Sequence, residues 1–367
     1  MQSASVVHYR FLDLLKAVAS NLIVLHHLAF YGPMVDHVKP VMPELIEWLE
    51  TQARIAVQVF LVMGGFLAAK SLSPDGMPGL RAPLRAVTRR FIKLVPPFMV
   101  AMALAVAGAA LAGRWMTHDS IGASPTLAQF AAHGLLLHGV LGYESLSAGA
   151  WYVAIDFQLY ALLTLLLWLA GRIAGGRPSD WLVPLLVIAG VGMSLFFFNL
   201  DADWDAWAPY FLGSYGLGVL AWWASMPGRP LIGAALIAGA MLLLGGLALE
   251  MEFRSRIAVA LVTALTLVVV YRGGISFSTT RWPLVEYLGR ISYAVFLVHF
   301  PVCLVINAAF TQFVPHSAWA QGGGMLLAWF ASLVVGALFH RWVEIPLGRL
   351  VTLQRGTGAH SRRTIEA

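Results

Sequence analysis

Long apolar stretches follow one another along almost the whole chain, and they leave few folds open to it. In windows of about 20 residues, the length that crosses a bilayer as a helix, the sequence contains ten such stretches. Their bounds are 11–31, 52–72, 91–113, 151–174, 182–199, 207–225, 230–250, 255–272, 290–310 and 323–343. Because helices satisfy their own backbone hydrogen bonds in lipid, the sequence predicts an all-α, polytopic membrane bundle of about ten transmembrane helices.

Basic residues are distributed unevenly over the connecting loops. They cluster densely between Lys70 and Lys93, whereas the loops assigned to the opposite side are mainly acidic or neutral. Since cytoplasmic loops carry the excess of lysine and arginine, we expect both termini to be cytoplasmic. A further short stretch, 126–142, would reverse this pattern if it crossed the membrane. We therefore expect an interfacial or re-entrant helix there.

We expect one transmembrane domain over residues 1–348 and a basic cytoplasmic tail at 349–367.

The charge and cysteine content exclude several classes of site and partner. The net charge of +6 follows from the basic loops, which meet anionic lipid headgroups, and indicates no nucleic-acid partner. Cys303 is the single cysteine, which excludes an intramolecular disulfide, and we predict no metal site. Charged residues interrupt the first apolar stretch, so no cleaved signal peptide is expected.

The first apolar stretch contains polar residues that a simple membrane anchor would not need. Lys16 and His27 are eleven positions apart, so they return to almost the same helix face after about three turns. The same face includes Asp13 and Ser20. Ionisable groups inside a bilayer are unfavourable and usually face a bundle interior. The stripe therefore predicts a functional site.

Asp156, near the outer end of the fourth stretch, is expected at a membrane depth similar to that of His27. A histidine and a carboxylate at matched depth can act as a general base and the group that orients it. A structural hydrogen bond between helices is the competing interpretation. His299 in the ninth stretch is a second-rank candidate, because a lone histidine on an apolar helix more often has a packing role.

A second cluster, Arg89, Arg90 and Lys93, stands at the predicted cytoplasmic mouth of the third stretch. Arginine can bind a phosphate through two hydrogen bonds and lysine adds a point charge, as the phosphates of CoA would require. A loop that only fixes topology and binds lipid is the alternative. Glu344, at the cytoplasmic end of the last stretch, is a second-rank candidate for a structural ion pair with Arg341 or with the basic loop.

Six motifs follow one another along the chain: RFLDLLKAVASNLIVLHH, GGFLAAKSL, RRFIKLVPPF, WYVAIDFQLY, LGRISYAVFLVHFP and RWVEIP. Their order resembles that of the acyltransferase 3 family of integral membrane acyltransferases. Together they extend over nearly the whole chain, and the number of predicted spans matches the family.

The resemblance implies transfer of an acyl group, commonly acetyl, from cytoplasmic acyl-CoA to a hydroxyl of a carbohydrate, glycolipid or other cell-envelope acceptor. It implies a multi-pass protein of a bacterial inner membrane without a tightly bound cofactor. His27 takes the place of the family's histidine, Lys16 that of its usual arginine and Asp156 that of its usual glutamate. The remaining motif positions are Arg90 and Lys93 for an Arg-x-x-Arg site, with Trp151 and Tyr160 as second-rank residues.

Two mechanisms fit these positions. In one, His27, oriented by Asp156, takes the proton of an acceptor hydroxyl that attacks the thioester, while Lys16 stabilises charge or orients Asp13. In the other, His27 carries a covalent acyl group between donor and acceptor.

Two other classes of protein compete with an acyltransferase. A proton-coupled secondary transporter or exporter of a polar metabolite also places ionisable residues in the membrane, but it should show an internal repeat, and none is found. A membrane scaffold would explain the helices but not the aligned polar stripe.

Overall fold

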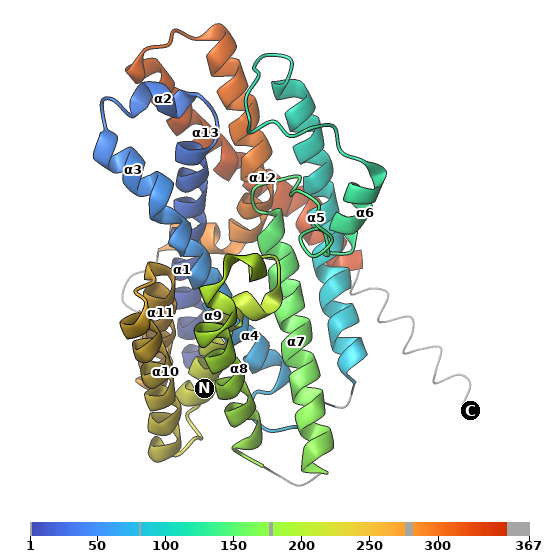
Figure 1. Cartoon of the computed structure of the whole chain (residues 1–367), viewed down its shortest axis with the longest axis vertical. Coiled ribbons are helices and arrows are strands. Elements are labelled where there is room, and N and C mark those ends of the chain that lie inside the picture. Colours follow the sequence, from blue (N-terminus) through green and yellow to red (C-terminus); the bar gives the residue numbers. More distant parts are fainter. Residues whose placement is uncertain (1, 81, 176–178, 276–281, 351–367) are drawn as a thin grey trace, which may run out of the picture. The chain divides into compact units, whose positions relative to one another are not determined.

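The structure is a computed structural model that describes residues 2–80, 82–175, 179–275 and 282–350 (Figure 1). The first half of the chain forms α1 (Gln2–Phe30), α2 (Met34–Val38), α3 (Pro43–Thr51), the 3-10 turn η1 (Ala53–Ile55), α4 (Ala56–Leu72), α5 (Pro83–Ala112), α6 (Leu127–Gly134) and α7 (Ala150–Ala174). The second half forms α8 (Leu182–Phe196), η2 (Phe198–Leu200), η3 (Ala202–Trp204), α9 (Ala208–Ser225), α10 (Leu231–Met251), α11 (Ser255–Arg272), α12 (Pro283–Phe313), α13 (Ala318–Phe339) and the π turn η4 (His340–Glu344). Most of the predicted tail, 351–367, lies outside the described residues.

The helices confirm the predicted all-α, polytopic membrane fold. Within the described residues, nine helical segments are long and apolar enough to cross a membrane. They are Arg10–Phe30, Pro43–Leu72, Pro83–Ala112, Ala150–Ala174, Leu182–Leu200, Leu231–Met251, Ser255–Arg272, Pro283–Phe313 and Ala318–Leu350. Each corresponds to one predicted span. The predicted stretch 207–225 is helical as α9 but is not among these nine.

The chain divides into two compact units, and four helices contribute a segment to each. The first unit contains Met1–Asn21, Arg54–Val87 and Ala154–Arg290, and the second contains Leu22–Ala53, Thr88–Val153 and Ile291–Ala367. The helices shared by both units are α1, α5, α7 and α12.

Within the first unit, α9 is surrounded by other helices, which explains its composition. It packs against α4, α8, α10 and α11, and fifteen of its 18 residues are buried. A helix that faces protein on all sides needs small residues for close packing rather than lipid-soluble side chains. At Gly65 of α4 and Gly218 of α9, an added Cβ would overlap the backbone carbonyls of Tyr215 and Val62, respectively. The two backbones therefore touch.

The direction of neighbouring helices indicates that α9 also crosses the membrane. In the first unit Arg10 of α1 pairs with Glu286 of α12 at 2.8 Å, and three residues further along each helix Asp13 meets Gly289. Helices α1 and α12 therefore run parallel. Two spans that run in the same direction must have an odd number of crossings between them. The candidate spans between α1 and α12 are α4, α5, α7, α8, α10 and α11, which is an even number, and α9 makes it odd. Ten crossings then result, as predicted, whereas the cytoplasmic location of the termini stays a prediction.

The segment predicted as a re-entrant or interfacial helix contains α6, which has only 8 residues. A helix of this length extends about 12 Å, less than half of the hydrocarbon core. The expectation that 126–142 does not cross the membrane is thus confirmed.

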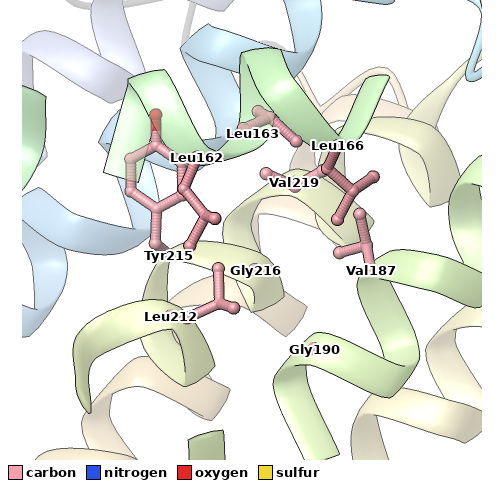
Figure 2. A pocket seen from close by; sticks show the side chains of 9 residues that line it. All are labelled: Leu162, Leu163, Leu166, Val187, Gly190, Leu212, Tyr215, Gly216 and Val219. Atoms are coloured by element: carbon pink, nitrogen blue, oxygen red, sulfur yellow. The ribbon is translucent and has the colours of Figure 1, made fainter. Parts of the chain in front are cut away.

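A depression in the first unit lies between α7, α8 and α9 (Figure 2). Its lining consists of Leu162, Leu163, Leu166, Val187, Gly190, Leu212, Tyr215, Gly216 and Val219. Apart from Tyr215 these side chains are aliphatic or absent, so the depression offers almost nothing to a polar substrate.

Candidate active site

The residues predicted for the site are divided between the two units. Asp13, Lys16, Asp156 and Tyr160 belong to the first, and the second holds His27, Arg89, Arg90, Lys93, Trp151, His299 and Glu344. The histidines, the basic cluster and Glu344 are therefore parts of one compact body.

His27 and His299 form a direct contact in the second unit. The Nδ1 atom of His27 lies 2.6 Å from the Nε2 atom of His299, and the two ring planes differ by 9°. The ring centres are 4.9 Å apart, much farther than the nitrogen atoms. Nearly parallel rings can meet this way only edge to edge in a common plane, which is the geometry of an N–H···N hydrogen bond rather than of a stack.

The backbone of α12 determines which nitrogen atoms of this pair carry protons. The Nδ1 atom of His299 lies 2.8 Å from the carbonyl oxygen of Phe296, so Nδ1 must be the donor. In the neutral ring Nε2 is then an acceptor, and the Nδ1–H group of His27 donates to it. The Nε2 atom of His27 is left with a free lone pair. The described residues make no hydrogen bond to that atom, so it is available as a base.

Close helix packing seals His299 but not His27. His299 is 0% exposed, whereas His27 keeps 8% of its surface exposed. Helices α5 and α13 and the residue before α7 each place a glycine against the part of α12 around His299. A Cβ added at any of these glycines would contact α12. The pairs are Gly108 with Pro301, Gly149 with Phe296 and Gly336 with Val295. Of the two rings, that of His27 is the one that keeps some exposed surface.

A buried amide clamps the end of α1 against α12, one to two turns beyond the histidines. The Nδ2 group of Asn307 donates to the carbonyls of Tyr31 and Cys303, and its Oδ1 atom accepts from the Met34 backbone at 3.2 Å. Gly32 has φ +93°, and an added Cβ would lie 2.5 Å from the Asn307 amide. Only glycine fits this turn, so the position of α1 beside α12 is fixed.

Asp156, the predicted partner of His27, is buried in the first unit. Its Oδ1 atom would lie 2.9 Å from a Cβ added to Gly64 of α4. A carboxylate that orients a base binds the nitrogen opposite the one that takes the proton, and that nitrogen of His27 already binds His299. The role of Asp156 stays a prediction, and His299 is the partner that the described contacts give to His27.

The other predicted residues occupy the following positions. Lys16 pairs with Asp13 at 3.3 Å, in agreement with a role in orienting that carboxylate. Trp151 contacts Tyr152 at the start of α7, and Tyr160 is buried on the same helix. Glu344 pairs with His340 at 2.8 Å across the π turn η4, whereas the predicted ion pair was with Arg341 or with the basic loop.

The basic cluster begins α5 and presents two different faces. Arg89 and Lys93 are exposed and four positions apart, which places them on one side of the helix. Arg90 projects elsewhere and is half-buried. Two cations along one exposed edge can bind a multiply charged anion.

A buried histidine pair, which the sequence did not mark as a site, lies at the end of α6 and in the connection that follows it. The rings of His133 and His138 stack at 3.9 Å between centres, and both are 0% exposed. Leu137 donates to Ala132 and Leu136 to His133, which is the Schellman pattern at the end of α6. Leu136 occupies the left-handed position of that motif with φ 58°, where glycine is usual. In the sequence, the feature that could have indicated this pair is the occurrence of His133 and His138 on either side of a short apolar run.

The packing of this connection is expected to weaken at acid pH. Burial, with a smaller contribution from His133, lowers the pKa of His138 from 6.5 to about 4, and burial also lowers the pKa of His133. The packed state favours neutral rings, so its stability is complete above about pH 6.5 and falls as the pH approaches 4. We expect the opening equilibrium to rise by up to about tenfold per pH unit in that window.

Hydrogen exchange of the amides in residues 135–147, corrected for intrinsic rates, would measure this opening at pH 7.5 and pH 5. A His138→Phe variant should show a weaker pH dependence because it removes the more strongly shifted group. Equal protection of the wild-type connection at both pH values would contradict the expectation.

Comparison with known proteins gives the family. A family model described as an acyltransferase domain matches residues 9–341. Comparisons with curated proteins and with solved structures found no significant match. The match covers most of the chain and includes both units, the histidine pair and the basic start of α5. The chain therefore belongs to the acyltransferase 3 family of integral membrane acyltransferases.

Proposed function

We propose that the protein transfers an acyl group, most simply acetyl, from acyl-CoA to a hydroxyl of a carbohydrate or other cell-envelope acceptor. The family supports a membrane acyltransferase in general. The observation that carries the finer proposal is the hydrogen bond from His27 to His299, because it leaves a neutral imidazole whose Nε2 lone pair has no partner among the described residues. A neutral imidazole is the base that acyl transfer to a hydroxyl requires near neutral pH.

In the proposed direct transfer, acyl-CoA and the acceptor hydroxyl are the only reactants. The Nε2 atom of His27 takes the proton of the acceptor hydroxyl while the hydroxyl oxygen attacks the thioester carbonyl. The C–S bond then breaks, and the thiolate of CoA receives the proton back from His27. His299 stabilises the transient imidazolium through the hydrogen bond that it accepts.

The same lone pair could instead attack the thioester and form an acyl-His27 intermediate. Release of one equivalent of CoA in the absence of acceptor, with acyl label retained on the protein, would establish that route. CoA release that depends on acceptor from the first turnover would establish direct transfer.

We assign the donor phosphates to the exposed cations of α5, Arg89 and Lys93, and Arg90, which projects from another face of the helix, stays a predicted donor-binding residue. The test uses the purified protein in lipid and follows CoA release with a panel of cell-envelope glycans. Arg89→Ala is expected to raise KM for acetyl-CoA by roughly tenfold, as loss of one charge-assisted contact would. With acetyl-pantetheine, which lacks the nucleotide phosphates, the same variant should behave like wild type.

Arg172→Ala is the matched control. Arg172 is a basic residue at the end of α7 that lies over the Trp168 ring, and no donor contact is assigned to it. Equal KM changes with both donors would show that Arg89 acts through topology or folding. Failure of the wild-type protein to bind or cleave acetyl-CoA would refute the donor assignment and favour a transporter.

A further inference from the structure

Two buried polar side chains between α6 and α7 have no hydrogen-bond partner among the described residues. They are His138, at both ring nitrogens, and Ser147, at its hydroxyl. The two residues are 0% and 1% exposed. Buried polar groups are nearly always paired in folded proteins, because an unpaired one destabilises the fold. Two such groups lie close together in sequence in this short connection.

The neighbouring His133 provides a contrast, because both of its nitrogens are satisfied. Its Nδ1–H group donates to the Gln129 carbonyl at 2.8 Å, and its Nε2 atom accepts from the Leu146 backbone at 3.1 Å. His133 therefore holds the two ends of the connection together, in one tautomer. His138 stacks on this fixed ring without taking part in its hydrogen bonds.

The unpaired groups match the chemistry of an alcohol. Burial lowers the pKa of His138 to about 4, so at neutral pH its ring offers one N–H donor and one nitrogen acceptor. Ser147 offers a hydroxyl that both donates and accepts. An alcohol hydroxyl has the same dual character, and a polyol has several. Neither group carries a charge that would select an anion.

The connection also leads directly to the histidine pair within the same unit. Two residues after Ser147, Gly149 lies so close to Phe296 that an added Cβ would be 3.3 Å from the Phe296 carbonyl oxygen. That oxygen accepts the hydrogen bond from His299. A molecule held by Ser147 would therefore be a few residues along the chain from the group that sets the tautomer of the proposed base.

We propose that His138 and Ser147 bind a hydroxyl-bearing acceptor of the polyol or carbohydrate class and help to determine which acceptor is used. This inference rests on the proposed function for its role in catalysis, but the binding itself does not require turnover. Because both groups are buried, binding must accompany a local opening of residues 135–147. The left-handed Leu136 is a second unfavourable feature of the same segment, and such features concentrate at functional sites.

The test replaces His138 with phenylalanine, which keeps a ring stacked on His133 and removes both nitrogens. We expect KM for the glycan acceptor to rise at least tenfold, with KM for acetyl-CoA unchanged within twofold. The melting temperature should stay equal or rise, because an unpaired buried polar group is lost. Ser147→Ala should act in the same direction. In the control His133→Phe, two hydrogen bonds are lost, and the melting temperature should fall.

A second readout separates this inference from the proposed function. Equilibrium binding of glycerol and of oligosaccharides of one to four hexose units is measured without acyl-CoA, on wild type and His138→Phe. Weaker binding by the variant supports the site even if no acyl transfer occurs. A more stable His138→Phe protein with unchanged acceptor KM and unchanged binding overturns the inference, as does failure of wild type to bind any of these probes.

Discussion

Replacing His27 with glutamine is expected to lower kcat by about 10²- to 10⁴-fold, the usual contribution of a general base. Glutamine keeps an N–H donor that can bond to the Nε2 atom of His299, but it has no lone pair able to take a proton at neutral pH. The fold should therefore persist while the proton transfer is lost. Turnover is measured as glycan-dependent CoA release by the protein in lipid, and folding as the melting temperature of the same sample.

His26→Gln is the matched control for this variant. His26 is adjacent and also buried, but its Nδ1–H group donates to the carbonyl of Leu49 on α3, so its role is structural. We expect it to change kcat by less than about tenfold. His299→Phe should lie between the two, because His27 stays in place but loses the acceptor that fixes its tautomer. If His27→Gln and His26→Gln lower kcat equally, His27 is not the base.

Replacing Gly218 with alanine should cause a large loss of stability in the first unit. The new Cβ would overlap the backbone carbonyl of Val62, and a backbone atom cannot move aside as a side chain end can. Helices α4 and α9 would have to separate along their whole interface. We expect a loss of more than about 3 kcal/mol in the free energy of unfolding.

The control for this variant is Gly246→Ala on α10. No atom lies within 4 Å of a Cβ added there, so alanine should leave stability unchanged or raise it by about 0.5–1 kcal/mol through higher helix propensity. Denaturant unfolding in mild detergent, followed by tryptophan fluorescence, compares the two variants. A Gly218→Ala protein as stable as Gly246→Ala would show that α4 and α9 do not touch at this point.

The transmembrane helices could be predicted from the sequence because each is specified locally. A backbone in lipid must satisfy its own hydrogen bonds, so an apolar run of sufficient length has one available structure. Helix α9 shows the limit of this rule. Its glycines and tyrosines reflect contacts with α4 and α8 rather than with lipid, and its crossing of the membrane is inferred from helix direction.

The pairing of His27 with His299 could not be predicted, because it depends on which helices are neighbours. The membrane depth inferred from position within each predicted span was misleading as well. From the predicted span starts at 11 and 290, His27 lies sixteen residues in (27 − 11) and His299 only nine (299 − 290). Both helices in fact start before their predicted spans, α1 at Gln2 and α12 at Pro283, so distance from a predicted span start did not indicate which side chains meet. The sequence located the candidate base but assigned it a different partner.

The hydrogen bond from His299 to the Phe296 carbonyl has a consequence for how this site can vary. In a serine protease the proton arrangement depends on an aspartate side chain, which one substitution can remove. Here the arrangement is anchored on a main-chain oxygen, which every residue at position 296 would supply. A substitution at position 296 would therefore leave this hydrogen-bond acceptor in place. The tautomer of His299, and with it the free lone pair of His27, should be retained as long as α12 stays helical.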